Sequence, residues 1–192
     1  PAHQPVDRDR DIQLVGLHVA GLHRRFVGGH QTQPAGIRLT SGKAGVPRLY
    51  GLHVFNPVPR MALVEVCIPD GAESARERAM AWCAALGKTA VEVPDQAGFV
   101  VNRLLFPYLF DGVRLMERTG MEAGEVDTCM KPGAGHPMGP FELMDATTSK
   151  LCLQAGEVLF EAYGERFRPP ALLKQRVRAG FTGGRNARGW RK

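Results

Sequence analysis

The sequence predicts an α/β layer followed by an all-helical domain, and three observations support this order. Short apolar, β-branched runs at residues 50–55, 62–68 and 89–93 are typical of strands. Between the last two runs, apolar residues recur at three-to-four spacing over 72–86, which predicts a helix ended by Gly87. Strand, helix and strand in this order indicate an α/β layer. Beyond a boundary near residues 94–98, the apolar spacing is helical only.

The second half carries the pattern of a helical domain. Helices are expected over 101–116, 123–130, 151–163 and 171–178. Pro107 is expected to kink the first of them. Residues 131–139, rich in Gly and Pro, are expected to form a loop, and Pro140 suits the first turn of a further helix.

Composition excludes several classes of protein. A hydrophobic content of 44% is enough for a core. The apolar runs fall well short of the roughly 20 residues of a membrane span, so no membrane partner is expected. The four cysteines show no C-x-x-C spacing, which predicts reduced, buried thiols in a cytoplasmic protein and no metal site. They are Cys67, Cys83, Cys129 and Cys152.

The positive charge lies mostly at the C-terminal end. The formal net charge is +6, and residues 163–192 hold nine Lys or Arg against the single acidic Glu165, a local net of 9 − 1 = +8. Because few aromatic residues interleave with them, the preferred interpretation is a solvated face rather than a nucleic-acid site. Attraction of a phosphate-bearing ligand is the alternative.

One stretch places a histidine and a carboxylate in two adjacent strand-like runs. It reads Leu49-Tyr-Gly-Leu-His-Val-Phe-Asn-Pro-Val-Pro-Arg-Met-Ala-Leu-Val-Glu-Val66. A turn at its Asn-Pro-Val-Pro segment would fold the two runs together and bring His53 to Glu65. An imidazole beside a buried carboxylate is a general acid/base pair. A buried structural histidine is the alternative.

This stretch, together with Gly98-Phe-Val-Val-Asn-Arg-Leu104, resembles the family of NAD-dependent 3-hydroxyacyl-CoA dehydrogenases over about residues 46–190. The resemblance implies the α/β end of a Rossmann-type domain followed by an all-α C-terminal domain. Residues 46–95 would be the C-terminal part of the NAD-binding domain, and 96–192 a helical domain for substrate binding and homodimerisation. It implies NAD-linked oxidation of a 3-hydroxyacyl-CoA to the 3-oxoacyl-CoA.

The resemblance also implies roles for single residues. His53 would take the proton from the substrate hydroxyl, Glu65 would orient the imidazole, and the Asn102 amide would donate to the substrate oxygen. Independently of the resemblance, the turn at Asn56 is expected to bring this residue to the substrate or the cofactor, and we assign it to cofactor binding. Asn102 as a helix-capping or surface residue and Asn56 as a plain turn residue are the alternatives. His136 is a rival base.

Residues 1–45 do not share this character. The chain has no G-x-G-x-x-G pattern, the fingerprint of a dinucleotide-binding turn. Residues 1–45 are therefore expected to be a truncated or non-native segment. The second hypothesis for the chain is a catalytically incomplete acyl-CoA-binding and dimerisation module.

Overall fold

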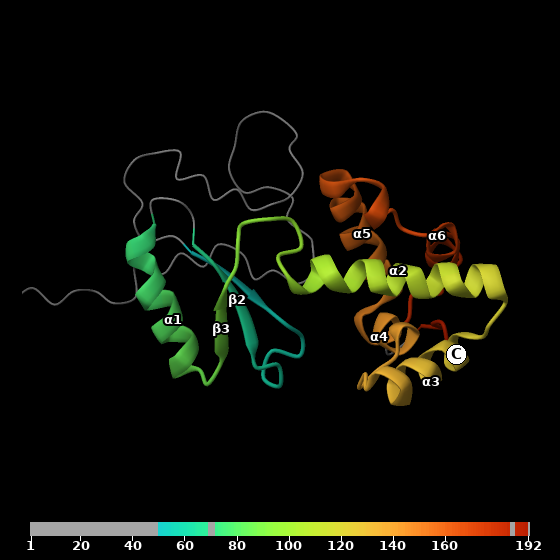
Figure 1. Ribbon diagram of the computed structural model, residues 1–192, viewed down its shortest axis with the longest axis horizontal. Coiled ribbons are helices and arrows are strands. Elements are labelled where there is room, and N and C mark those ends of the chain that lie inside the picture. The colour runs from blue at the N-terminus through green and yellow to red at the C-terminus, as the bar shows by residue number, and fades with distance from the viewer. Residues whose placement is uncertain (1–49, 69–71, 185–186, 192) are drawn as a thin grey trace, which may run out of the picture. The chain divides into compact units, whose positions relative to one another are not determined.

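The computed structural model describes residues 50–68, 72–184 and 187–191. These residues fall into two compact units, divided after Phe99. The first unit is an α/β layer and the second is helical, which confirms the predicted fold class (Figure 1). The predictions for residues 1–45 lie outside the described part of the chain.

The first unit is built on a three-stranded sheet. Its strands are β1 (Gly51–Val54), β2 (Leu63–Cys67) and β3 (Thr89–Glu92), in the order β1-β2-β3. β1 and β2 run antiparallel, joined by the predicted turn, whereas β2 and β3 are parallel. The parallel pair requires a crossover, which helix α1 (Arg76–Ala85) supplies after the short 3₁₀ helix η1 (Glu73–Ala75).

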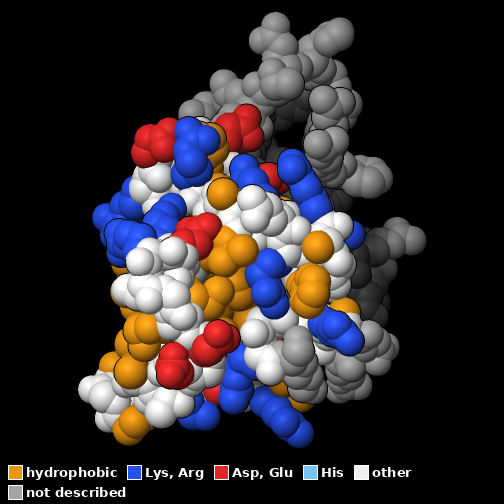
Figure 2. Space-filling view, turned by 90° about the vertical axis from the view of Figure 1, so that its right-hand side faces the viewer, with side chains coloured by type: hydrophobic (Ala, Val, Ile, Leu, Met, Phe, Trp, Pro, Cys, Tyr) orange, Lys and Arg blue, Asp and Glu red, His pale blue; other side chains and the backbone are white. Residues whose placement is uncertain are grey.

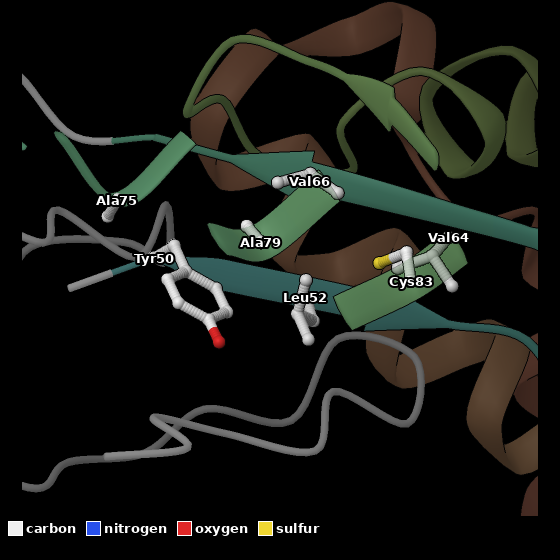
Figure 3. Close-up of a cluster of buried hydrophobic side chains, with 7 residues drawn as sticks. All are labelled: Tyr50, Leu52, Val64, Val66, Ala75, Ala79 and Cys83. Atoms are coloured by element: carbon white, nitrogen blue, oxygen red, sulfur yellow. The ribbon is translucent and has the colours of Figure 1, made fainter. Parts of the chain in front are cut away.

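Alternation along the strands separates the core from the candidate site. Side chains two residues apart point to the same face of a sheet. Leu52 of β1 and Val64 and Val66 of β2 belong to a buried cluster that includes residues of η1 and α1, as Figure 3 shows. His53 and Glu65 alternate with these residues, so they lie on the opposite face of the sheet. The full cluster is Tyr50, Leu52, Val64, Val66, Ala75, Ala79 and Cys83.

The helical unit consists of five α-helices and one 3₁₀ turn within the described residues. They are α2 (Val101–Thr119), α3 (Ala123–Ala134), α4 (Pro140–Thr147), α5 (Ser149–Tyr163), η2 (Glu165–Phe167) and α6 (Ala171–Arg178). Its core comes from several of these helices, and the large buried side chains include Phe110, Phe141, Met144, Leu159 and Leu173. α6 has the predicted bounds, and α2 continues as one helix through Pro107.

The predicted loop at 131–139 was wrong over its first part. α3 continues through Pro132 to Ala134 and ends at Gly135, which has a left-handed φ of 69°. A proline removes one amide donor from a helix, but that loss alone does not end α3. Glycine at the C-terminal end supplies the left-handed conformation that stops a helix. The stop signal was therefore Gly135.

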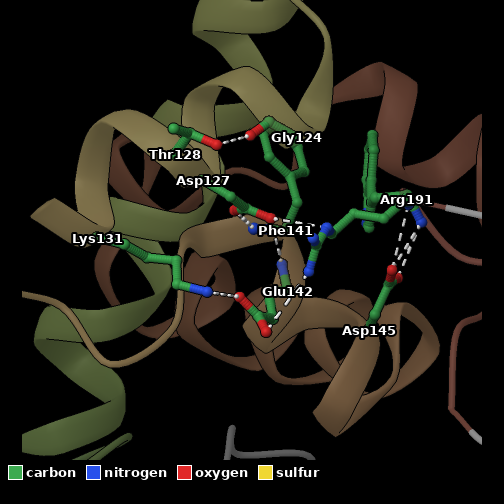
Figure 4. A network of polar contacts seen from close by, with 9 residues as sticks. Gly124, Asp127, Thr128, Lys131, Phe141, Glu142, Asp145 and Arg191 are labelled. Carbon is green, nitrogen blue, oxygen red and sulfur yellow. Dashed lines mark hydrogen bonds and ion pairs between the residues drawn. The ribbon is translucent and has the colours of Figure 1, made fainter.

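Two carboxylates, the buried Asp127 and the half-buried Asp145, join segments of the helical unit (Figure 4). Asp127 of α3 accepts hydrogen bonds from the amides of Phe141 and Glu142, at 2.8 and 3.0 Å, and so caps the start of α4. Asp145 of α4 accepts from the amide of Trp190 at 2.9 Å. No local sequence pattern indicated either contact, because the partners are 14 and 45 residues apart.

The cysteine prediction was correct for three of four residues. Cys67, Cys83 and Cys152 are buried free thiols, whereas Cys129 on α3 is exposed. Within residues 50–68, 72–184 and 187–191, no helix has both the length and the apolarity needed to cross a membrane.

Candidate functional site

His53 and Glu65 form a buried pair across the antiparallel strands. The register of β1 and β2 sets them directly opposite each other, and opposite side chains on one face of such a pair are close enough to interact. The His53 Nδ1 atom lies 2.5 Å from the Glu65 Oε2 atom. The two residues are only 3% and 2% exposed, so water does not screen the contact. The turn at 56–59 thus brings the pair together as expected.

The pairing determines which ring nitrogen is basic. An ionised carboxylate only accepts hydrogen bonds, so the hydrogen bond is satisfied when the proton lies on Nδ1. Nε2 is then left with the lone pair. A carboxylate in this position also stabilises the imidazolium that forms when Nε2 takes a proton. The arrangement is competent for general acid/base chemistry.

Two phenyl rings contact the imidazole. The Phe55 ring centroid lies 4.5 Å from that of His53, with 55° between the planes, and the Phe99 centroid lies 5.4 Å away at 31°. Phe99 has a φ of 44°, in the left-handed region that a bulky residue seldom adopts. Such a conformation costs on the order of 1–3 kcal/mol. Neither ring was identified from the sequence, although a glycine directly before Phe99 was a signal for an unusual turn.

A lysine holds the turn that joins β1 to β2. The Lys88 ammonium donates to the carbonyl oxygens of Val58 at 2.6 Å and Met61 at 2.9 Å. Asn56 is exposed in this turn and precedes a cis peptide bond to Pro57. The turn geometry agrees with the interpretation of Asn56 as a turn residue. Its contact with a cofactor stays a prediction.

The other two candidates lie in the helical unit. Asn102 is half-buried in the first turn of α2, and its substrate role stays a prediction. His136 has its Nδ1 atom 3.1 Å from the Tyr108 hydroxyl and contacts that ring edge-on. His136 has a phenol partner where His53 has a carboxylate, so His53 remains the preferred candidate for the catalytic base. In the described part of the chain, no cluster of three or more His, Cys, Asp or Glu has metal-ligand geometry.

Comparison with known proteins assigns both halves of the chain. Residues 24–96 match the family model for the NAD-binding domain of 3-hydroxyacyl-CoA dehydrogenase, and residues 98–192 match the model for its C-terminal domain. The first match begins well before residue 46, where the resemblance in the sequence begins. Part of the segment 1–45 therefore shares the family's pattern.

Curated relatives carry the same description. A probable 3-hydroxyacyl-CoA dehydrogenase of Caenorhabditis elegans is 39% identical over 148 residues, which are 76% of this chain and 48% of that protein. A probable 3-hydroxybutyryl-CoA dehydrogenase of Bacillus subtilis is 40% identical over 147 residues, 74% of this chain and 50% of that protein. The human mitochondrial hydroxyacyl-coenzyme A dehydrogenase is 52% identical over 99 residues, 51% of this chain and 32% of that protein. The chain thus spans between a third and a half of the length of these relatives.

Solved structures agree with the relatives. FadB2 of Mycobacterium tuberculosis superimposes with a TM-score of 0.75 at 35% identity, over 83% of this chain and 57% of that one. The (S)-3-hydroxybutyryl-CoA dehydrogenase PaaH1 of Ralstonia eutropha gives a TM-score of 0.75 at 33% identity, over 82% of this chain and 57% of that one. With both domain models matched in order, the chain belongs to the 3-hydroxyacyl-CoA dehydrogenase family.

Proposed function

We propose that this chain carries the acid/base part of a 3-hydroxyacyl-CoA dehydrogenase, an oxidoreductase that interconverts a 3-hydroxyacyl-CoA and the 3-oxoacyl-CoA. The observation that supports this most is the buried hydrogen bond of 2.5 Å between His53 and Glu65. Two relatives are named 3-hydroxybutyryl-CoA dehydrogenases, so a short acyl chain is the first substrate to test.

The proton chemistry follows from the pair. In the oxidation, Nε2 of His53 takes the proton of the 3-hydroxyl group as hydride leaves the same carbon. The developing positive charge on the imidazole is balanced by the Glu65 carboxylate, which also prevents the ring from taking the wrong tautomer. In the reduction, the imidazolium returns the proton to the oxygen at C3. The Asn102 side-chain amide is the proposed donor to that oxygen.

NAD is the cofactor of the family's nucleotide-binding domain, and residues 24–96 match that domain. Bound NAD would supply the hydride acceptor. A dinucleotide's pyrophosphate needs a glycine-rich strand-to-helix turn with free amide donors. The sequence has no G-x-G-x-x-G pattern to form such a turn. The described residues therefore fit the proton-handling side of the reaction and do not provide the phosphate site.

The missing phosphate site favours a second candidate function, that of an acyl-CoA-binding and dimerisation module without turnover. Titration calorimetry of the 192-residue chain with NADH and then with acetoacetyl-CoA separates the two. NADH binding followed by NADH oxidation supports the dehydrogenase. Acetoacetyl-CoA binding without NADH binding supports the module.

His53→Gln tests the proposed base directly. The amide cannot take a proton at neutral pH but keeps an N–H donor for the buried Glu65 carboxylate, so we expect turnover to be abolished while the circular dichroism spectrum is unchanged. The matched control is His136→Gln, which removes the rival imidazole and should leave turnover near that of the wild type. Turnover near wild type in His53→Gln would remove His53 from the mechanism.

We further propose a homodimer formed through α2. Leu104 is 66% exposed and Leu115 is 36% exposed. Eleven residues are about three helical turns, so both lie on one side of α2. Figure 2 shows hydrophobic side chains gathered among charged ones on a face of the helical unit. An exposed apolar patch of this kind is typical of an interface.

Leu104→Glu tests this interface, since a charge within it should leave the chain monomeric in light scattering after gel filtration. Leu86→Glu, at a residue 53% exposed in the other unit, is the control and should remain dimeric. A wild-type chain that is monomeric at micromolar concentration would contradict the proposal. Affinity for nucleic acid is not expected, and the cytoplasmic location stays a prediction, since several relatives are named mitochondrial.

A further inference from the structure

Phe99 combines a left-handed backbone conformation with a ring that lies beside the His53 imidazole. Its backbone φ is 44°, directly after Gly98 with a φ of 76°, and its amide donates to the Gln96 carbonyl at 2.9 Å to close a turn. Its ring lies 5.4 Å from the His53 imidazole, with only 31° between the planes. Glycine adopts a positive φ at little cost, whereas phenylalanine does not. A strained backbone persists only where the surrounding structure holds it, and such residues cluster at functional sites.

Several contacts set the orientation of the imidazole. The contact from Nδ1 to the Glu65 Oε2 atom fixes one end of the ring. Phe55 and Phe99 supply further contacts to the ring. Phe55 follows β1 directly and approaches from the same strand, whereas Phe99 reaches His53 from 46 residues further along the chain. The turn at 96–99 places the Phe99 ring beside the imidazole.

We propose that Phe99 is a positioning residue for His53. Its left-handed backbone conformation directs the phenyl ring onto the imidazole, which limits rocking of the ring and keeps water from the Nδ1–Oε2 hydrogen bond. The direction in which Nε2 presents its lone pair is then fixed. This inference rests on the proposed function for its consequence in catalysis, but the ordering of the ring is independent of turnover.

Nuclear magnetic resonance on the full chain tests the ordering. The wild type should show nuclear Overhauser effects between the Phe99 ring protons and the His53 ring protons, and their absence would overturn the proposal. A proton in a short, buried hydrogen bond gives a far-downfield signal, and His53→Gln assigns it by removing it. In Phe99→Leu this signal should be lost to exchange with water, and Phe99→Tyr should restore it.

Two further variants separate the ring from other causes. Phe99→Gly accommodates the positive φ without strain but has no ring, so it should also lose the signal. A retained signal in Phe99→Leu or Phe99→Gly would show that the ring is not needed. Tyr50→Leu is the matched control, because Tyr50 is an aromatic residue of the buried cluster on the other face of the sheet. It should lower stability and keep the signal.

Kinetics then links the ordering to the proposed reaction. If the chain turns over, Phe99→Leu should lower kcat between about tenfold and a hundredfold, because misorientation of a base slows the chemical step. KM for acetoacetyl-CoA should change by less than about twofold, since Phe99 then acts on the chemical step more than on binding. Loss of the His53 signal in a chain without turnover supports the positioning role while the proposed function fails. Unchanged kcat together with a lost signal would overturn the catalytic consequence.

Discussion

A buried imidazole and a buried carboxylate depend on each other at the level of single residues. Removal of one partner leaves the other without compensation in a site from which water is excluded, and such changes are strongly destabilising. His53 and Glu65 are each at most 3% exposed. A test of the carboxylate must therefore change its charge and keep its shape.

Glu65→Gln meets this condition. The amide retains an oxygen that accepts from Nδ1, but it no longer balances an imidazolium and can favour the wrong tautomer. We expect turnover to fall on the order of 100-fold or more. An NADH-oxidation assay with acetoacetyl-CoA measures this, with circular dichroism as the check on folding. Full activity in Glu65→Gln would mean that the charge has no part in the reaction.

Thiol reactivity should differ sharply between two cysteines. Burial, with Asp95 and Glu92 nearby, raises the pKa of the Cys67 thiol to about 12. At pH 8 its thiolate fraction is then about one part in ten thousand, and the thiolate is the nucleophile. Cys129 is exposed. We expect iodoacetamide to label Cys129 first in the folded chain, read by mass spectrometry, and to label all four cysteines in urea. Rapid labelling of Cys67 in the folded chain would contradict its burial.

At the level of elements, one glycine permits the close approach of α5 to α2. A Cβ atom added at Gly156 would overlap the Phe110 ring and lie 3.0 Å from the Pro169 Cγ atom. Gly156→Ala should therefore lower the free energy of unfolding by about 1–3 kcal/mol. Gly133→Ala, in α3 with nothing within 4 Å of the added atom, is the control and should raise it by about 0.5–1 kcal/mol. Urea unfolding measures both, and equal effects would rule out the packing argument.

The cap on α4 predicts a pH dependence. Burial raises the pKa of the Asp127 carboxyl above its ordinary 3.8 and outweighs the opposing effects of the Phe141 and Glu142 amides and of Arg191. The folded state therefore holds the proton more tightly than the unfolded state. The stability this adds is fully present below 3.8 and is lost as the pH rises through the folded pKa.

Asp127→Asn removes that titration and keeps an acceptor oxygen for the cap. The free energy of unfolding of the wild type, minus that of the variant, should decline as the pH rises above 3.8 and then level off. Urea unfolding at a series of pH values between 3 and 8 measures the difference. An increase with pH would mean that the amide contacts dominate and that the pKa of Asp127 is lowered.

At the scale of the whole molecule, the helical unit has its own core. The large side chains buried in it come from α2 through α6, and Asp127 and Asp145 cap and fasten elements of the same unit. A segment of residues 98–192 should therefore fold alone. We expect a helical circular dichroism spectrum and a cooperative thermal transition. A spectrum without helix, or melting without a transition, would show that the first unit is required.

Much of this architecture was predictable from local patterns. The alternation in 50–55 and 62–68 gave the strands, and three-to-four spacing gave the helices, with the bounds of α6 correct. Pro107 and Pro132 both lie inside helices. The free energy lost with one amide donor is small compared with the free energy gained by burying a whole apolar face. The end of α3 at Gly135 was missed for this reason.

The sequence by itself determined that His53 and Glu65 belong to adjacent strands, because a short Pro-rich turn reverses the chain between the two runs and so favours their pairing. Only the tertiary structure decided that they lie directly opposite each other at 2.5 Å. It also decided that the Phe99 ring lies beside the imidazole, with 5.4 Å between the ring centroids, and that Asp127 caps α4. These contacts join residues many positions apart, so they depend on how whole elements pack. Local hydrophobic periodicity indicates which face of an element is buried, but it does not indicate which residue of another element packs against that face.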